Sequence, residues 1–229
     1  MDIQEHLTKL REAGILIECQ SAWNTSLLPV KKPGGGYRPV QYLKVINKVT
    51  ISLHPVVPNL YTLLRQILGS VRWFTCLNLK DAFFCLHLAP QSQPSFAFEW
   101  TKPVTGCQMQ MTWTRLPQGF KNSPTLFGEA LAADLADFLK ETTRCVLLQH
   151  VDDLLLASDT QEDCMKGINA LLQLLTYSGY QSSWKKAQIC QQQVRYLGFL
   201  LTKGKRELGP ERKKVITTLS QSQNKTRLV

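Results

Sequence analysis

Three features that would place the chain in a specialised class of protein are missing from its sequence. No apolar stretch approaches the roughly 18 residues that a membrane-spanning helix needs. The N-terminus, Met1 to His6, lacks the basic segment and apolar core of a secretory signal. None of the seven cysteines forms a Cys-x-x-Cys pair, so neither a zinc site nor a disulfide framework is indicated. We therefore expect an intracellular, cytoplasmic protein without a signal peptide or transmembrane segment.

Acidic residues are scarce in the C-terminal part of the chain. From Trp184 to Val229, eleven Lys or Arg residues stand against Glu207 and Glu211, a net charge of +9. The first 183 residues carry sixteen positive and fifteen negative charges. A basic segment of this kind suits a polyanion, and nucleic acid is the first candidate. From charge alone, a solvated and partly disordered tail is an equally good interpretation.

The chain has enough length and apolar content for a proper core. Its 229 residues allow one large domain or two small ones, and 44% of them are hydrophobic. The mean hydropathy of -0.14 is typical of a soluble globular protein. We find no internal repeat.

The strongest local pattern is a pair of adjacent carboxylates between two apolar runs. Asp152 and Asp153 interrupt the stretch from Cys145 to Ser158, which predicts two buried strands of a hairpin. Aspartate is an ordinary turn residue, so a polar turn is one interpretation. Two anions at a tight turn nevertheless repel each other unless a cation or solvent neutralises them. The apolar flanks favour a metal site over a plain turn.

Other segments predict a mixture of helices and strands. Helical spacing is found at 3–14, around Tyr61 to Leu68, after Pro124 and at 168–179; the helix after Pro124 presents Phe127, Leu131, Leu135 and Phe138 on one face. Strands are expected at 73–79, 96–100, 109–116 and in a last hairpin at 196–205. Two further strands flank the glycine-rich tip of Lys31 to Val40. That tip is either a solvated hairpin or a loop that folds over phosphates.

Five of these landmarks, in this order, resemble the reverse transcriptase of gammaretrovirus-type and endogenous retroviruses. They are Leu27 to Pro33, Leu79 to Cys85, Leu116 to Pro124, Val151-Asp152-Asp153 and Tyr196-Leu197-Gly198. The resemblance covers roughly Ile3 to Val215. It implies a fragment of a Pol polyprotein with an α+β fold, the fingers and palm of a right-hand polymerase. That fold has an antiparallel palm sheet with packed helices, and the thumb is largely absent.

The resemblance also implies domain boundaries, a reaction and partners. A reverse transcriptase domain would cover 1–215, with fingers at 1–70 and 90–115, palm at 71–89 and 116–209, and a basic tail at 210–229. The reaction is RNA-directed DNA synthesis, in which a nucleotidyltransferase adds deoxynucleotides to a primer 3′ end. Two Mg²⁺ ions held by three carboxylates would activate the hydroxyl and neutralise the leaving pyrophosphate. Partners would be a primed RNA or DNA template, deoxynucleoside triphosphates and other polyprotein regions, with no membrane.

Individual site residues are carried over from the resemblance. The metal-binding and catalytic carboxylates correspond to Asp152 and Asp153. Phe83 corresponds to the bulky residue that excludes a ribose 2′-hydroxyl, although core packing beside Phe84 is the plainer interpretation. The remaining positions bind substrate or grip the primer: Lys31, Lys32, Arg38, Gln118 and Gly119 for substrate, and Tyr196, Leu197, Gly198 and Phe199 for the primer.

The chain departs from the family pattern at the third carboxylate. The family has Asp immediately before Leu79, where this chain has Asn78. An amide oxygen is neutral and bridges two cations poorly, so we expect weakened Mg²⁺ binding and a loss of several orders of magnitude in rate. Asp81 is not expected to rescue the site, because three residues along a strand it would face the other way. His150, Tyr42 and Lys44 also differ from the family.

Three hypotheses follow from the sequence. The first is a polymerase-derived fingers and palm fragment that is defective in catalysis. The second is a non-catalytic nucleic-acid-binding or interaction protein that retains the fold, with weak base preference because recognition would rest on duplex shape and backbone. The third is a product that does not fold stably, which a cooperative thermal transition would exclude.

Overall fold

The computed structural model describes residues 3–31, 37–54, 62, 64, 71–102, 105–141, 144–210 and 212–214. The chain forms two compact units, each built from two chain segments. Unit 1 comprises residues 1–56 and 81–133, and unit 2 comprises residues 57–80 and 134–229. Within the described ranges, no helix is long and apolar enough to cross a bilayer. Of the predicted helix around Tyr61 to Leu68, the structure describes residues 62 and 64, both helical, and Leu64 is buried. The tail beyond residue 214 lies outside the described residues.

Unit 1 is a helix packed on a small antiparallel sheet, with a separate hairpin. Its sheet has the order β1-β6-β5. The hairpin pairs β2 with β3, as the sequence predicts for the strands flanking the glycine-rich tip. The bounds of its elements are α1 Ile3–Glu12, β1 Leu16–Glu18, β2 Leu27–Lys31, β3 Tyr37–Gln41, α2 Lys44–Val49, η1 Ala82–Cys85, η2 Gln93–Phe96, β5 Phe98–Thr101, β6 Gln108–Trp113 and α4 Ser123–Asp134.

The core of unit 1 forms where the apolar face of α1 meets the sheet. Ile3, Leu7 and Leu10 recur at helical spacing and are all buried, as the sequence predicts. They cluster with Phe98 and Trp113 of the sheet. The chain leaves α1 at Gly14, whose φ of 66° is readily available to glycine.

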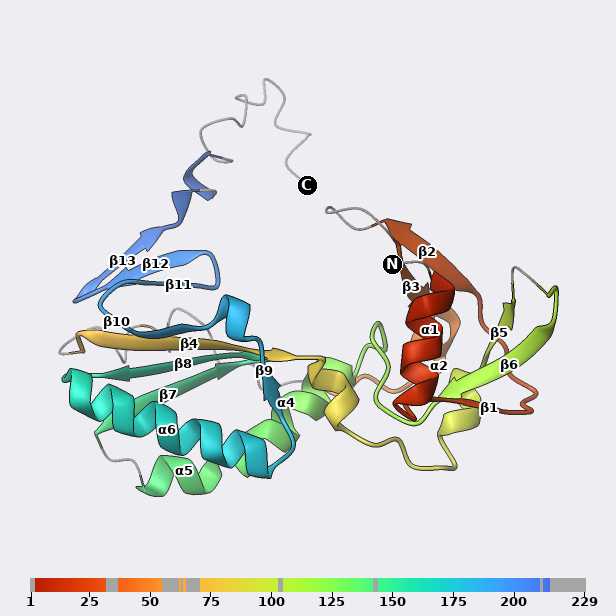
Figure 1. Cartoon of the computed structure of the whole chain (residues 1–229), viewed down its shortest axis with the longest axis horizontal. Coiled ribbons are helices and arrows are strands. Elements are labelled where there is room, and N and C mark those ends of the chain that lie inside the picture. The colour runs from red at the N-terminus through yellow and green to blue at the C-terminus, as the bar shows by residue number, and fades with distance from the viewer. Residues whose placement is uncertain are drawn as a thin grey trace. The chain divides into compact units, whose positions relative to one another are not determined.

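Unit 2 is a sheet covered by helices on one face and by a small second sheet on the other (Figure 1). The large sheet has the order β10-β4-β8-β7, with β9 also pairing with β4, and the small sheet has the order β11-β12-β13. The bounds of its elements are β4 Trp73–Lys80, α5 Ala136–Glu141, β7 Cys145–His150, β8 Asp153–Ser158, α6 Gln161–Tyr177, β9 Gln181–Ser182, η3 Trp184–Lys186, β10 Gln188–Gln191, β11 Val194–Tyr196, β12 Phe199–Thr202 and β13 Lys205–Leu208.

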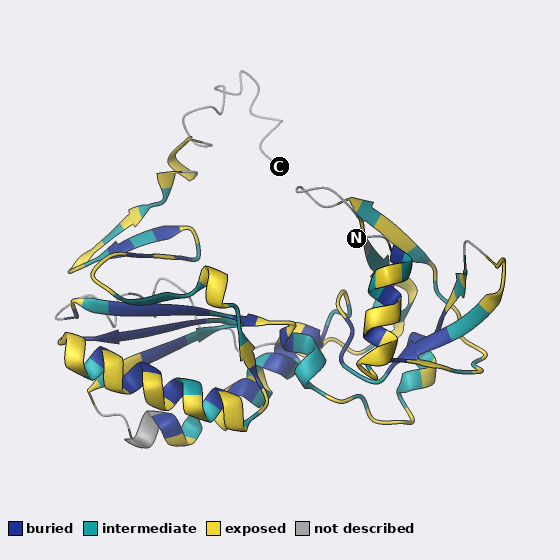
Figure 2. Ribbon diagram, viewed as in Figure 1, coloured by how far each residue is buried: buried dark blue, intermediate teal, exposed yellow. Residues whose placement is uncertain are grey.

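Alternation along β4 assigns its side chains to the two faces of the large sheet. Phe74 and Cys76 belong to the core that includes Tyr196 and Phe199 of the small sheet. Asn78 continues that series and so lies on the same face as Phe74 and Cys76. The apolar stripe of α6 lies against the other face, and Figure 2 shows its buried and exposed turns alternating.

Two local expectations were wrong. The expected single helix after Pro124 is two helices, α4 and α5, separated at Leu135. Its four predicted apolar residues are nevertheless all buried. The first strand of the carboxylate hairpin is also less buried than predicted, since Val146 is 39% exposed. The reason is that β7 lies at the edge of the sheet and has β8 as its partner on one side.

Candidate functional site

The carboxylate hairpin is formed by β7 and β8, and β4 lies beside it in the sheet. Asp153 begins β8 and lies between two cross-strand partners, Asn78 on β4 and His150 on β7. Because directly opposed residues project to the same face of a sheet, this register brings the three side chains together. The sequence predicted the hairpin, and the structure adds the strand that completes the site.

The turn between β7 and β8 contains a strained residue. Val151 has a φ of 54°, which a β-branched side chain rarely adopts. The backbone carbonyl of Asp152 accepts a hydrogen bond from the Leu79 amide at 2.8 Å, so the turn is fastened to β4. Strain held in place by surrounding contacts is common at functional sites.

The side-chain amide of Asn78 contacts both carboxylates. Its Nδ2 donates to Asp153 Oδ1 at 2.8 Å and lies 3.4 Å from Asp152 Oδ2. Carboxylate oxygens only accept hydrogen bonds when ionised, so the amide must turn its NH₂ group toward them. Asn78 therefore places two partial positive hydrogens where two negative groups converge.

A pocket of about 250 Å³ opens beside Asn78 and Asp153. Its lining combines apolar groups with two cationic side chains: Cys76, Leu77, Asn78, Asp153, Lys186, Gln188, Arg195, Tyr196 and Leu197. This mixture of apolar and cationic groups arises because β10 and β11, which belong to the basic segment of the chain, lie alongside β4 near the carboxylates.

Burial next to the carboxylates raises the pKa of two pocket residues. The pKa of the Cys76 thiol rises from its ordinary value of 9.0 to about 12, first through burial and then through the charge of Asp153. The pKa of the Tyr196 hydroxyl also rises, mainly through burial and secondarily through Asp153 and Cys76. Both groups therefore stay protonated at neutral pH. The Tyr196 hydroxyl lies 3.4 Å from the backbone oxygen of Asp153.

The predicted primer-gripping residues form the turn between β11 and β12. Tyr196 pairs with Phe199 across this turn, and Leu197 and Gly198 form its tip. Both tip residues have positive φ, at 47° and 77°. The Phe199 ring also faces the guanidinium of Arg212 at 5.0 Å, a cation–π contact.

The predicted substrate-binding residues belong to unit 1. Lys31 is exposed at the end of β2, and Arg38 pairs with Val30 in the same hairpin. Gln118 and Gly119 are exposed in the loop between β6 and α4. Lys32 lies outside the described residues.

Two of the unit 1 positions have defined local contacts. Phe83, in η1, is half-buried and makes an edge contact with Phe127 at 5.8 Å between ring centroids. The carbonyl of Gly119 accepts a hydrogen bond from Asn47 Nδ2 at 2.9 Å, and its φ of 92° suits glycine. These contacts fix the local conformation at both positions.

Sequence reasoning missed several residues of the site in unit 2. Cys76, Lys186, Gln188 and Arg195 line the pocket although no role was predicted for them. One signal was available, because Lys186 and Arg195 belong to the basic segment that begins at Trp184. That β10 runs beside β4 could not be read from the charge pattern.

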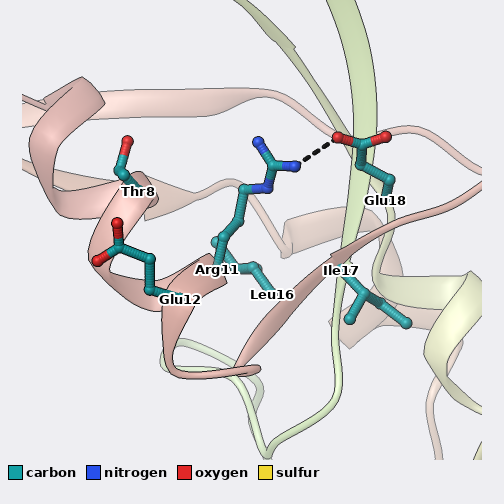
Figure 3. A pocket seen from close by; sticks show the side chains of 6 residues that line it. All are labelled: Thr8, Arg11, Glu12, Leu16, Ile17 and Glu18. Atoms are coloured by element: carbon teal, nitrogen blue, oxygen red, sulfur yellow. Dashed lines mark hydrogen bonds and ion pairs between the residues drawn. The ribbon is translucent and has the colours of Figure 1, made fainter.

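A second pocket, of about 530 Å³, lies in unit 1 between α1 and β1 (Figure 3). It is lined by Thr8, Arg11, Glu12, Leu16, Ile17 and Glu18. Arg11 and Glu18 pair with each other across it at 2.5 Å. None of the predicted site residues lines this pocket.

The comparison with protein families identifies the family of the chain. The family model described as reverse transcriptase (RNA-dependent DNA polymerase) matches residues 30–201, three quarters of the chain. The chain belongs to the reverse transcriptase family. The α+β polymerase fold of fingers and palm expected from the resemblance is confirmed.

Proteins similar to this reverse transcriptase domain include three viral polyproteins. It is 56% identical over 225 residues to the Pol polyprotein of Feline endogenous virus ECE1, and 56% identical to the Gag-Pol polyprotein of Baboon endogenous virus (strain M7). It is 58% identical over 215 residues to the Gag-Pol polyprotein of Gibbon ape leukemia virus. These matches cover 93–98% of the chain but 13–22% of the polyproteins.

Solved structures with a similar fold include two from foamy virus. A foamy viral protease-reverse transcriptase in complex with double-stranded DNA matches with a TM-score of 0.81 at 30% identity, over 95% of this chain and 36% of that one. A complex of the foamy viral protease-reverse transcriptase with an RNA/DNA hybrid gives a TM-score of 0.77 over 95% of this chain and 28% of that one.

Reverse transcriptases generally use Mg²⁺, an ion that oxygen ligands hold. Within the described ranges, no three His, Cys, Asp or Glu side chains converge closely enough to hold an ion. Two carboxylates converge, and the third group at the site presents amide hydrogens to them. Hard cations need oxygen ligands, and this arrangement therefore does not fit a two-ion centre.

Proposed function

We propose that this chain is the fingers and palm portion of an RNA-directed DNA polymerase whose catalytic centre is inactive. The observation that carries the proposal is the 2.8 Å hydrogen bond from Asn78 Nδ2 to Asp153 Oδ1. In the family, an aspartate at this position would complete three metal-binding carboxylates. Here the same position supplies hydrogen-bond donors to the remaining two.

Converting this arrangement into a metal site is unfavourable for two reasons. The Asn78 amide would have to turn its oxygen inward and give up hydrogen bonds to charged groups, which are worth about 1.5–3 kcal/mol each. The site would also carry two negative charges where the family has three, so two divalent cations would be poorly neutralised. Asp81 offers no substitute, because β4 ends at Lys80 and Asp81, with left-handed backbone angles, begins the turn into η1.

The remaining site residues keep their proposed family roles. We propose fingers at 1–70 and 90–115 and a palm at 71–89 and 116–209, with Tyr196 to Phe199 as the primer-gripping turn. Residues 81–89 and 116–133 of that palm belong to unit 1. Phe83 would restrict the sugar of an incoming nucleotide, and Gln118 and Gly119 would support the templated base pair. Lys31, Lys32 and Arg38 would meet the triphosphate, whose charge they complement.

A second candidate function is nucleic-acid binding without catalysis. It is favoured by the cationic side chains of Lys185, Lys186 and Arg195, which form no ion pair with any described residue. Two such cations line the pocket beside the carboxylates. The two functions are compatible, since a silent polymerase domain can still hold a template.

Primer extension on an RNA template, with Mg²⁺, tests the proposal. We expect no extension by the native chain and detectable extension by Asn78→Asp. An Asn78→Asp/Asp153→Asn double variant is the matched control and should be silent. Extension by the native chain would overturn the claim that Asn78 disables the site. Silence of the single variant, in a chain that still binds the primed template, would place the defect elsewhere.

A further inference from the structure

The turn that connects β9 to β10 holds a tryptophan directly beside the carboxylate site. β9 pairs with β4 at Leu79, and β10 pairs with β4 at Cys76, so the turn passes alongside Asn78. The Ser183 amide donates to the carbonyl of Asn78 at 2.9 Å, and Trp184 is the next residue. The backbone of this turn is therefore fixed to the strand that carries the site.

The Trp184 side chain is left largely in solvent. It is 78% exposed, whereas the Trp113 side chain in the core of unit 1 is 6% exposed. Burying an aromatic side chain is strongly favourable, so a rigid turn that exposes one gives up stability. Figure 2 shows the turn between β9 and β10 as an exposed segment above the sheet.

Cationic residues lie close to Trp184 along the chain and in the adjoining pocket. Lys185 and Lys186 follow it in η3, and both are exposed. Lys186 and Arg195 line the pocket that also contains Asp153. No described acidic residue pairs with any of these three cations. The surface thus combines an aromatic face with positive charges that pair with no described acidic residue.

The ligand that fits this combination is a nucleic-acid strand. Phosphates attract the lysine and arginine side chains, and a nucleobase stacks on the face of an indole. In a duplex, the flat faces of the bases are covered by their neighbours, so a base free to stack must be unpaired or terminal. An acidic peptide would satisfy the cations but would leave the indole face without a flat partner.

We propose that Trp184 stacks on an unpaired base of a nucleic-acid strand whose phosphates lie on Lys185, Lys186 and Arg195. This inference rests on the proposed function, because it needs a chain that binds nucleic acid. It adds a base-contacting residue beside the carboxylates. Stacking tolerates any base, so the contact gives affinity without sequence preference.

The test is anisotropy titration of a labelled single-stranded oligonucleotide over a range of salt concentrations. Trp184→Ala is expected to weaken binding about tenfold, equivalent to about 1.4 kcal/mol, with an unchanged salt dependence. Trp184→Phe should retain most of the affinity. Lys185→Gln should instead lower the slope of log affinity against log salt by about 0.7. Tyr177→Ala is the matched control in the same unit, since Tyr177 is 94% exposed at the end of α6.

The outcomes separate this inference from the proposed function. Native affinity in Trp184→Ala, with binding otherwise intact, would overturn the stacking role alone. Polyglutamate is a polyanion without bases. If Trp184→Ala lowered the affinity for polyglutamate as much as it lowers the affinity for the oligonucleotide, the stacking role would also be overturned. No salt-dependent binding of the native chain to any oligonucleotide would refute nucleic-acid binding itself, and the inference with it.

Discussion

A side-chain amide and a carboxylate have nearly the same shape, but the amide NH₂ group donates hydrogen bonds whereas an ionised carboxylate only accepts them. Asn78 offers hydrogen to Asp153, where an aspartate would offer another anion. The amide therefore donates a 2.8 Å hydrogen bond to Asp153 and a longer one, at 3.4 Å, to Asp152 without any ion. One exchange of oxygen for nitrogen accounts for the proposed loss of catalysis, while β4 and β8 still pair at this position.

Val151 gives a prediction about strain at the same turn. Its φ of 54° places a β-branched residue in the left-handed region, where asparagine is better tolerated. We expect Val151→Asn to raise the free energy of unfolding by about 1 kcal/mol, measured by urea denaturation. Val146→Asn, at an exposed position of the same hairpin, is the control and should not stabilise. A loss of stability in Val151→Asn would show that the turn is not strained.

The raised pKa of Cys76 predicts a pH dependence of stability. Its native pKa is about 12 against an ordinary value of 9.0, so above that value the unfolded chain releases a proton that the native chain keeps. The contribution is complete below pH 9.0 and is lost as pH rises toward 12. In that window, the native chain should lose about 1.4 kcal/mol per pH unit more than Cys76→Ala. Equal slopes in urea denaturation would contradict the assignment.

At the scale of elements, the periodic spacing of hydrophobic residues predicted most helices and strands. The remaining features depend on which elements lie next to one another in the fold. The hairpin at Cys145 to Ser158 could be predicted because both strands carry apolar runs. That β7 lies at the sheet edge depends on β4 pairing with the other side of β8. The break at Leu135 was missed because the predicted apolar residues of α4 and α5 are all buried, as they would be in a single continuous helix. The Asn78–Asp153 contact joins residues 75 apart, which no local pattern reveals.

The packing of α6 on the sheet gives a prediction for Gly167. Alanine is normally better than glycine in a helix by about 1 kcal/mol. Here an added Cβ would lie 2.8 Å from Cys145 Sγ and 3.1 Å from Leu156 Cδ2. We therefore expect Gly167→Ala to destabilise the chain by about 1–3 kcal/mol, measured by urea denaturation.

A double-mutant cycle tests that explanation. Cys145→Ala removes the sulfur that the new Cβ would meet, so it should restore part of the stability lost in Gly167→Ala. Additive effects of the two substitutions, or a gain of stability in Gly167→Ala alone, would contradict the close contact.

At the scale of the whole molecule, the two units divide the sequence in an interleaved way. Each unit combines two segments. The periods along the chain indicated a mixture of helices and strands, whereas the α+β polymerase fold was expected from the family resemblance. The net charge of +10 is concentrated after Trp184, and the described part of that segment supplies β10 to β13 of unit 2. Composition could indicate a polyanion as partner. Placing its cations beside the carboxylates required the sheet order.

The most direct test of the central claim is thermal unfolding of the native chain and of Asn78→Asp, each in EDTA and in Mg²⁺. We predict that Mg²⁺ leaves the native midpoint unchanged, because the Asn78 amide presents hydrogens, not an oxygen ligand, to the two carboxylates. Without metal, Asn78→Asp should melt at a lower temperature, because three anions converge and about 1–3 kcal/mol of hydrogen bonding is lost. Mg²⁺ should raise its midpoint, because binding to the native state stabilises it. Equal stabilisation of both chains by Mg²⁺ would contradict the account.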